Sequence, residues 1–479
     1  MPTFIKFSRQ LLEFQSLYVL REIGRQVGVK SPSSTKREDL IEKILLIQSG
    51  ELKPVEVAKQ GAPSRPVDVS MFYLEEIRKP LDIEHPDENV LKMIESANKH
   101  ASGNIVFNES PLNAKGVLEI TQNGYGFLRN DNFLPSDDDV YVSIQMIRNN
   151  YLKNGDYIEG EARSVQSASA PSLQKINKLN GKKFQVNYER AKFDTLTAYY
   201  PTEKICLSNE NNDTLNRIID LFVPLGLGQR GLIVAPPKTG KTTVIKKVAD
   251  AISKNCPKVK LFVLLVDERP EEVTDILRSV KGEIGYSTFD KAPENHIRVA
   301  ELLLESAKRL VENGEDVVIL MDSITKLARA YNNTVESSGK TLTGGINPNS
   351  LVLPKKIFGS ARNVVDGGSL TIISTALIET GSRMDEVIYE EFKGTGNMEI
   401  HLSRALSERR IFPAIDILRS GTRKEELLLS EEELKVSYKL RKLLANKKDA
   451  TETLISIIES TSSNQELIKK IDEIIKEYN

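Results

Sequence analysis

The chain has 479 residues, 39% hydrophobic and 28% charged, which excludes a wholly disordered protein and suggests about three domains. Sixty-six Lys and Arg residues against 67 Asp and Glu give a net charge of −1, so only a local basic patch could bind a nucleic acid. Two cysteines exclude a disulfide framework, and the four histidines show no metal-ligand spacing. No apolar run reaches the roughly 18 residues of a membrane span. The first residues carry no apolar block with a cleavage site, so we expect a cytoplasmic protein without a membrane partner.

Helical periodicity comes first in the chain. Residues 1–50 are expected to form a helical segment, because apolar residues near a 3.6-residue spacing fill Leu11–Val27 and recur over Leu40–Ile47. Thr35, with Glu38 three residues later, is the predicted N-cap of the second helix. Residues 51–113 are punctuated by six prolines, and we expect them to be a linker or an insertion.

The apolar period changes to two from Lys115 onward. Five short strands are predicted, with Gly, Asn and Asp between them, at Gly116–Thr121, Tyr125–Arg129, Asp139–Ser143, Tyr157–Arg163 and Gln174–Leu179. Five such strands are typical of a small antiparallel barrel, which we expect over residues 114–181. Residues 182–224 would connect this barrel to the next domain.

Strands and helices alternate from about Leu225, which predicts an α/β domain over residues 225–430. Its predicted elements are the strands Gly231–Val234, Lys260–Val266, Asp316–Met321 and Ser369–Thr375 and the helices Lys241–Ser253, Glu271–Val280 and Arg298–Asn313. Unbroken apolar strands between helices indicate a parallel sheet covered on both faces. The tail, residues 431–479, is expected to be helical.

The stretch APPKTGKTT, Ala235–Thr243, follows a predicted strand and opens a predicted helix, which is the setting of a Walker A phosphate loop. Backbone N–H groups would wrap a β-phosphate at the helix N-terminus, Lys241 would reach the β- and γ-oxygens, and Thr242 would ligate Mg²⁺. Ala235 replaces the glycine of the strict pattern. A second GKT, Gly339–Thr341, has no apolar strand directly before it and is not taken as a nucleotide site.

Two of the predicted strands end in acidic residues. Asp322 follows one strand in the Walker B arrangement, which puts a carboxylate beside the Mg²⁺ held by Thr242. Glu268 ends another strand and would orient and polarise the attacking water. Either residue alone could be a helix cap, but together with a phosphate loop the two favour ATP hydrolysis.

Four arginines gather between Arg409 and Arg423, well after the phosphate loop. In ring ATPases a cationic side chain from the neighbouring subunit completes each site, and these arginines are candidates for that role. A solvated basic face is the alternative. Phe412 would stack on an adenine or belong to the core.

The segment NGYGFLR, Asn123–Arg129, alternates glycine with aromatic residues on a predicted barrel strand. The glycines would let bases approach, Tyr125 and Phe127 would offer stacking faces, and Arg129 and Tyr141 would extend the platform. The spacing resembles the cold-shock domain pattern, and a barrel core with glycine turns is the alternative.

A second candidate for nucleic-acid binding is Gly339–Val365, which has four basic residues and no acidic one. Its start is polar and glycine-rich and is expected to be a mobile loop, which suits a nucleic-acid channel. An ordinary surface loop is the alternative.

These motifs together resemble the bacterial Rho transcription termination factors. The resemblance runs from about Lys115 to Leu429 and is densest in Gly228–Thr242, Val266–Thr274, Met321–Asn332, Ser338–Gly345, Met384–Arg404 and Arg410–Leu428. The family's Walker A loop also begins with alanine. The resemblance implies a RecA-like P-loop ATPase core with an N-terminal helical segment and a cold-shock/OB-like barrel. It further implies an ATP- and Mg²⁺-dependent RNA–DNA helicase that works as a homohexamer, binds nascent RNA and acts on RNA polymerase.

The resemblance also implies roles for individual residues. The nucleotide would be bound by Gly226, Leu227, Gly228, Gln229, Arg230, Gly231, Lys238, Thr239, Gly240, Lys241, Thr242, Thr243, Arg269 and Phe412. Glu268 would be the catalytic carboxylate, with Arg269 at the nucleotide and Arg423, with Arg410, as the arginine acting on the neighbouring site. The primary RNA site would contain Gly124, Tyr125, Gly126, Phe127, Leu128, Arg129, Asp139, Val140 and Tyr141. The central-channel RNA loops would contain Lys340, Thr341, Leu342, Thr343, Gly344, Gly345 and Lys393.

The sequence departs from the family pattern in two places. The stretch SASAPS, residues 167–172, has no aromatic residue where the family commonly closes a pyrimidine pocket, and residues 51–113 have no counterpart in short members. Two other classes of protein remain open: a rotary or export ATPase subunit, and a non-motor RNA-binding protein with a regulatory nucleotide site. An ATPase assay with and without RNA separates these alternatives.

Overall fold

The computed structural model describes residues 35–53, 112–164, 170–185, 190–208, 213–336, 343–365 and 367–478, together with scattered positions between residues 9 and 32. The chain divides into two compact units, Met1–Val106 and Phe107–Asn479. Within the described residues, none of the helices combines the length and the apolar character needed to cross a membrane.

The first unit contains helix α3, Arg37–Ser49, which ends at Gly50 in the left-handed conformation with φ of 85°. Its N-cap is Lys36, without a side-chain cap, while the Thr35 hydroxyl donates to the carbonyl of Ser31 at 3.0 Å. The predicted cap at Thr35 is therefore wrong. The buried apolar residues of this unit include Leu12, Leu20, Ile23, Val29, Leu40, Ile41 and Ile44. Most of the predicted linker, residues 54–111, lies outside the described residues.

The second unit begins with a six-stranded barrel sheet. Its elements are β1 (Leu112–Ile120), β2 (Gly126–Arg129), β3 (Val140–Val142), α5 (Ile144–Asn149), β4 (Tyr157–Arg163), β5 (Ser172–Leu179) and β6 (Lys182–Lys183). The strand order is β3-β2-β1-β4-β5-β6, and β3 also pairs with β5, which closes the barrel. The predicted barrel is confirmed, because strands that alternate buried and exposed residues close around one apolar core.

The α/β domain that the sequence predicts to be an ATPase core is built on a nine-stranded sheet in the same unit. Its strands are β7 (Ala198–Tyr199), β8 (Arg230–Ala235), β9 (Lys260–Glu268), β10 (Glu283–Thr288), β11 (Asp316–Asp322), β12 (Arg362–Val364), β13 (Ser369–Leu377), β14 (Met398–His401) and β15 (Gly421–Thr422). The main order is β10-β9-β11-β13-β8-β14-β15, and the first six of these strands run parallel. The parallel sheet predicted from the apolar strands is confirmed.

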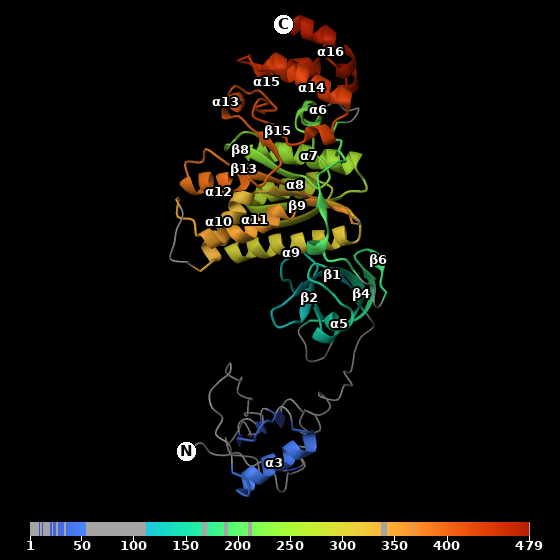
Figure 1. Cartoon of the computed structure of the whole chain (residues 1–479), viewed down its shortest axis with the longest axis vertical. Helices are drawn as coiled ribbons and strands as arrows, with labels where there is room; N and C mark the ends of the chain where they lie inside the picture. Colours follow the sequence, from blue (N-terminus) through green and yellow to red (C-terminus); the bar gives the residue numbers. More distant parts are fainter. Residues whose placement is uncertain are drawn as a thin grey trace. The chain divides into compact units, whose positions relative to one another are not determined.

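Helices cover both faces of this sheet (Figure 1). They are α6 (Thr214–Phe222), α7 (Lys241–Asn255), α8 (Pro270–Ser279), α9 (Pro293–Glu312), α10 (Ile324–Thr334), α11 (Val352–Gly359) and α12 (Arg383–Lys393). The connecting segments contain α13 (Arg404–Glu408), which has no buried residue, and short 3-10 helices at Phe193–Thr195, Pro348–Leu351 and Glu425–Leu427. Alternate residues of each strand enter different cores: Val263 and Leu265 pack towards α7 and α8, whereas Phe262 and Leu264 pack towards α9 and α10.

The tail forms α14 (Glu431–Leu444), α15 (Ala450–Glu459) and α16 (Asn464–Tyr478), as predicted. These helices share one apolar core with α6 and with one face of the sheet. The fully buried Arg217 of α6 donates to the carbonyls of Ile458 and Thr461, both at 2.6 Å. The tail therefore packs as a part of the ATPase core.

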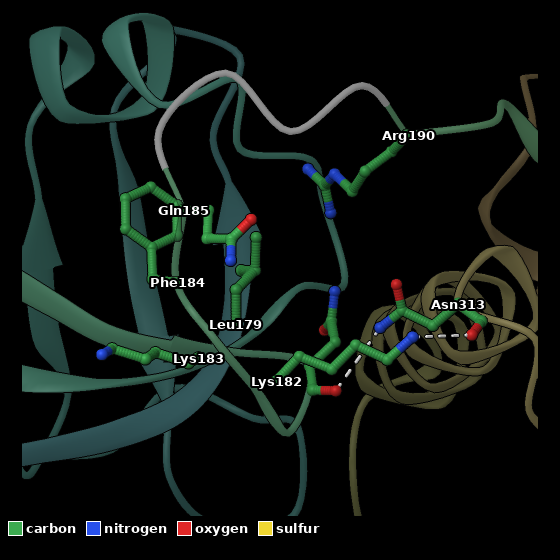
Figure 2. Close-up of a pocket in the computed structure, with 8 residues that line it drawn as sticks. Leu179, Lys182, Lys183, Phe184, Gln185, Arg190 and Asn313 are labelled. Atoms are coloured by element: carbon green, nitrogen blue, oxygen red, sulfur yellow. Dashed lines mark hydrogen bonds between the residues drawn. The ribbon is translucent and has the colours of Figure 1, made fainter.

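The barrel is anchored on the ATPase core by its β2–β3 loop. The Asn132 side chain accepts from the backbone N–H of Tyr286 in β10 at 2.7 Å and donates to its carbonyl at 2.8 Å, and Phe133 is buried in the core beside α9. On the other side of the barrel, the Lys182 amine donates to the carbonyl of Asn313, the residue after α9, at 2.9 Å. A pocket of about 290 Å³ lies there, and none of the predicted site residues lines it (Figure 2).

Candidate functional site

The phosphate loop occupies the turn between β8 and α7, as the sequence predicts. Gly240 is the N-cap of α7 in the left-handed conformation with φ of 86°, and the Thr239 hydroxyl donates to the Pro236 carbonyl at 2.7 Å. The first turn of α7 thus presents its free N–H groups at the end of the sheet, the backbone arrangement that binds phosphate. Phe412 lies over this loop, 50% exposed, with its ring 3.8 Å from where a side chain on Gly240 would begin.

Four charged side chains meet beside the loop, at the carboxyl ends of β9 and β11. The Lys241 Nζ lies 2.5 Å from Asp322 Oδ1 and 3.1 Å from Glu268 Oε1. The Lys326 Nζ, from α10, lies 2.7 Å from the same Glu268 oxygen. Both carboxylates are buried. The structure therefore brings together Lys241, Glu268 and Asp322, which the sequence nominated separately.

The charges of this cluster reinforce one another. Burial lowers the pKa of Lys241, but Asp322 and Glu268 outweigh it, so that the pKa is raised overall. Burial raises the pKa of Glu268, but Lys241 and Lys326 outweigh it, so that this pKa is lowered overall. The lysine stays protonated and the glutamate ionised at neutral pH.

Asp322 and Thr242 offer oxygens of the kind that would hold a Mg²⁺ ion. Asp322 Oδ2 is buried and has no hydrogen-bond partner among the described residues, while its Oδ1 accepts from the Thr375 hydroxyl at 2.7 Å. The Thr242 hydroxyl lies 3.5 Å from Glu272 Oε2, and burial followed by the charge of Glu268 raises the pKa of Glu272. A buried carboxylate oxygen without a partner, on a residue that contacts Lys241 of the phosphate loop, is a ligand that a hard divalent cation prefers.

A second group of predicted residues lies at the opposite end of β8. Gly226, Leu227, Gly228 and Gln229 precede the strand, and Arg230 and Gly231 begin it. Six residues of strand span about 20 Å, so these residues do not meet the phosphate loop that follows the strand. Their contacts are structural: the Gln229 amide donates to Asn397 Oδ1 at 2.6 Å, and a side chain on Gly228 would lie 2.3 Å from the Asn363 nitrogen.

The two arginines expected to act on a neighbouring site are separated in the structure. Arg423 is exposed beside the N-terminal ends of β8 and β14, where its N–H donates to the Asn397 carbonyl at 2.9 Å. Arg410 is exposed in the segment that leads to Phe412, and this segment is held to the phosphate loop by the Ser407 hydroxyl, which donates to the Lys238 carbonyl at 2.9 Å. Arg269, also exposed, is the N-cap of α8 directly after Glu268.

Three half-buried aromatic rings cluster on the barrel. The centroids of Tyr125, Phe127 and Tyr141 lie 5.8 to 5.9 Å from one another. Gly126, between two of the rings, does not open the surface as expected: a side chain there would lie 2.7 Å from Leu118, so this glycine lets β2 approach β1 and not a base. Rings grouped in this way offer stacking faces to unpaired bases.

The charged residues predicted beside the rings are covered. Arg129 is buried and forms ion pairs with Glu119, at 2.5 Å, and with Asp139, which is also buried. Its guanidinium lies 4.9 Å from the centroid of the Phe127 ring. Leu128 and Val140 point into the barrel core. Arg129 therefore supports the ring cluster from beneath, and the expectation that it extends the stacking surface is not met.

Comparison with known proteins places the chain in a family. Residues 114–185 match the Rho termination factor, RNA-binding domain, and residues 216–422 match the ATP synthase alpha/beta family, nucleotide-binding domain. Transcription termination factor Rho of Bacillus subtilis (strain 168) is 52% identical over 373 residues, covering 78% of this chain and 87% of the relative. Transcription termination factor Rho of Thermotoga maritima is 52% identical over 363 residues, covering 75% and 85%. The chain belongs to the Rho family.

The loops that the Rho resemblance assigns to a central channel are described in part. Lys340, Thr341 and Leu342 lie outside the described residues. Thr343, Gly344 and Gly345 follow, and a side chain on Gly344 would lie 2.9 Å from the Met384 nitrogen near the start of α12. Lys393 ends α12, with its amine 3.6 Å from Glu390 Oε1. At 1.5 Å per residue, the length of α12 separates the two loops by about 15 Å.

Several residues of the Rho site escaped the sequence reading. Glu272 lies inside a predicted helix, Lys326 lies in a segment for which no element was predicted, and neither carries a signal of its own, although each follows a strand-end acid by four residues. Thr375 lies in an apolar strand, and Glu119 looks like an ordinary outward-facing strand residue. Lys326 and Glu272 each lie in the first turn of a helix that begins beside the site. This position is the feature of the sequence from which both could have been predicted.

Proposed function

We propose that the protein is an ATP-driven transcription termination factor that captures nascent RNA on its barrel and moves along it as an RNA–DNA helicase. The observation that carries the proposal is the pairing, in one unit, of the Lys241–Glu268–Asp322 cluster with a half-buried cluster of aromatic rings on a barrel. Residues 114–181 would hold RNA, and residues 225–430 would hydrolyse ATP. RNA polymerase is the further partner that this function requires.

The ATPase site supports hydrolysis by a water molecule. Lys241 exchanges its carboxylate partners for the β- and γ-oxygens of ATP, which frees Glu268 to accept a hydrogen bond from water. The water oxygen attacks the γ-phosphorus and the bond to the bridging oxygen breaks, which yields ADP and phosphate. Asp322 and Thr242 would hold Mg²⁺, which neutralises charge on the β- and γ-oxygens when bound.

A homohexameric ring explains where Arg423 lies. It sits beside the opposite end of β8 from its own phosphate loop, next to a pocket of about 430 Å³ that Arg419 also lines. A closed ring with head-to-tail interfaces can set this end of one subunit against the loop of the next. Arg423 would then stabilise charge on the γ-phosphate of its neighbour.

The test is ATP hydrolysis by the full chain with and without single-stranded RNA. We expect RNA to raise turnover severalfold or more, and mutation of the three rings to weaken this stimulation. A rate of ATP hydrolysis that does not change when RNA is added would support a rotary or export ATPase subunit instead. Tight RNA binding without hydrolysis would support a binding protein with a regulatory nucleotide site.

A further inference from the structure

Lys326 is a charged residue that the proposed mechanism does not use. It lies in the first turn of α10, whose N-cap Ser323 accepts from the Lys326 N–H at 3.2 Å. Its side chain is 17% exposed, and its amine lies 2.7 Å from Glu268 Oε1 and donates to the Asp267 carbonyl at 2.8 Å. Two contacts to the last residues of β9 therefore fix the amine in place.

Lys241 and Lys326 contact the same oxygen of Glu268 but differ in what ATP does to them. Lys241 lies at the phosphate loop and turns to the phosphates when nucleotide binds. Lys326 comes from another helix, and its bond to the Asp267 backbone does not depend on nucleotide. When ATP is bound, Lys326 is thus the cation that stays on Glu268.

The other charged groups around Glu268 cannot replace it. Asp322 and Glu272 are carboxylates as well, so they cannot offset the negative charge of Glu268. Arg269 is the adjacent residue, but it is exposed and begins α8 with its side chain outside the cluster of ion pairs that the structure describes. A buried carboxylate that loses its cations is strongly destabilised as an anion.

We propose that Lys326 is a positioning residue that holds the Glu268 carboxylate in place and ionised while Lys241 is engaged with ATP. The proposal rests on the proposed ATPase function. It assigns Lys326 no contact with ATP or with the attacking water, and its effect on the reaction passes through Glu268 alone. Loss of Lys326 should therefore slow turnover and leave nucleotide binding intact.

The experiment compares Lys326→Met and Lys326→Arg with the wild-type full chain. Lys326→Met should lower the RNA-stimulated kcat roughly 10- to 100-fold, as losses of supporting partners commonly do, with KM for ATP and calorimetric ADP affinity within about twofold. Lys326→Arg keeps the charge and should recover most of the rate. Lys246→Met is the matched control, because it breaks a Lys–Asp275 pair of 2.7 Å between α7 and α8, and it should leave kcat unchanged.

A double-mutant cycle makes the assignment decisive. In a Glu268→Gln background, Lys326→Met should cause almost no further loss of kcat, because its effect passes through Glu268. Full additivity of the two losses, a parallel loss of ADP affinity, or wild-type turnover in Lys326→Met would each overturn the proposal. Wild-type protein without RNA-stimulated hydrolysis would instead overturn the proposed function, so the two failures are distinguishable.

Discussion

The ATP site and the ring cluster of the barrel use charge in opposite ways. In the ATP site, Lys241 and Asp322 pair at the place where the ligand binds, so ATP must exchange one contact for another. In the barrel, Arg129 and Asp139 are paired and buried, and the uncharged rings remain accessible. In the ATP site the charged side chains would contact the ligand themselves. In the barrel the charged side chains support the aromatic rings, and the rings would contact the RNA.

The largest effect should come from Arg423, which in the proposed ring would complete the ATP site of the neighbouring subunit. Arg423→Ala should lower turnover by roughly 10³- to 10⁵-fold, the range of arginine fingers. Mixing Arg423→Ala subunits with Lys241→Ala subunits should restore part of the activity, since an interface can then pair one intact loop with one intact arginine. ATPase activity across mixing ratios measures this.

Lys424→Ala is the control for this mixing experiment. Lys424 is the exposed neighbour of Arg423, and its amine lies 3.6 Å from the centroid of the Tyr200 ring. Its loss should change turnover little. If mixtures of the two variants gained no activity, Arg423 would act within its own subunit or not at all. The ATP site would then be complete within one chain.

The second largest effect on turnover should come from Glu268, the carboxylate expected to activate water in the ATP site. Glu268→Gln keeps the size of the side chain and should lower turnover by roughly 10²- to 10⁴-fold while sparing ADP binding, because only the activation of water is lost. Glu271→Gln, an exposed change at the start of α8 three residues after Glu268, is the matched control and should have no effect. Near-full turnover in Glu268→Gln would shift the role to Asp267.

The two regions also differ in how far the sequence predicts them. Strand ends of a parallel sheet meet at one edge, so Glu268 and Asp322 could be placed together from the pattern alone. The same logic fails for residues on helices, which is why Lys326 and Glu272 were missed. The resemblance assigned Gly226–Gly231 to the nucleotide, and in this chain they lie at the end of β8 opposite to its own phosphate loop, so their role stays a prediction.

In the barrel, residue type was a poor guide to exposure. Arg129 follows Phe127 by two residues on strand β2, so it was expected on the same face, beside Phe127 at the surface. It is buried because Glu119, opposite Phe127 on the neighbouring strand, and Asp139 both reach it. Such cross-strand partners depend on register, which turn lengths set and which this sequence does not reveal.

The buried pair in the barrel gives a smaller effect, on stability. Arg129→Met leaves Asp139 buried without its cation, and breaking such a pair costs about 3–5 kcal/mol. Amide exchange in β1–β3 should accelerate accordingly, while ATP hydrolysis without RNA stays unchanged. Lys175→Met, which breaks an exposed pair with Glu161 at 3.1 Å in the same barrel, should cost about 0–1 kcal/mol. Equal effects of the two changes would show that Arg129 is not the support of the rings.

The smallest effect concerns which RNA the rings prefer. Stacking tolerates any base and is worth about 1–3 kcal/mol per base, whereas discrimination needs hydrogen bonds in a closed pocket. Tyr141, whose N–H donates to the Pro171 carbonyl at 2.8 Å, lies beside the end of the SASAPS stretch, where the family commonly has an aromatic residue. Residues 167–169 of that stretch lie outside the described residues, and Ala170–Ser172 offer only small side chains.

We therefore expect weaker cytosine preference than the family pattern implies. Phe127→Ala should weaken binding to poly-C, poly-U and poly-A by a similar factor, measured at one fixed salt concentration because phosphate contacts make every affinity salt-dependent. Tyr151→Ala, an exposed aromatic of the barrel outside the ring cluster, is the control and should leave all three affinities unchanged. A strong preference for poly-C that disappears in Tyr141→Ala would show that another group closes the pocket, and that the rings of this barrel read bases as well as stack on them.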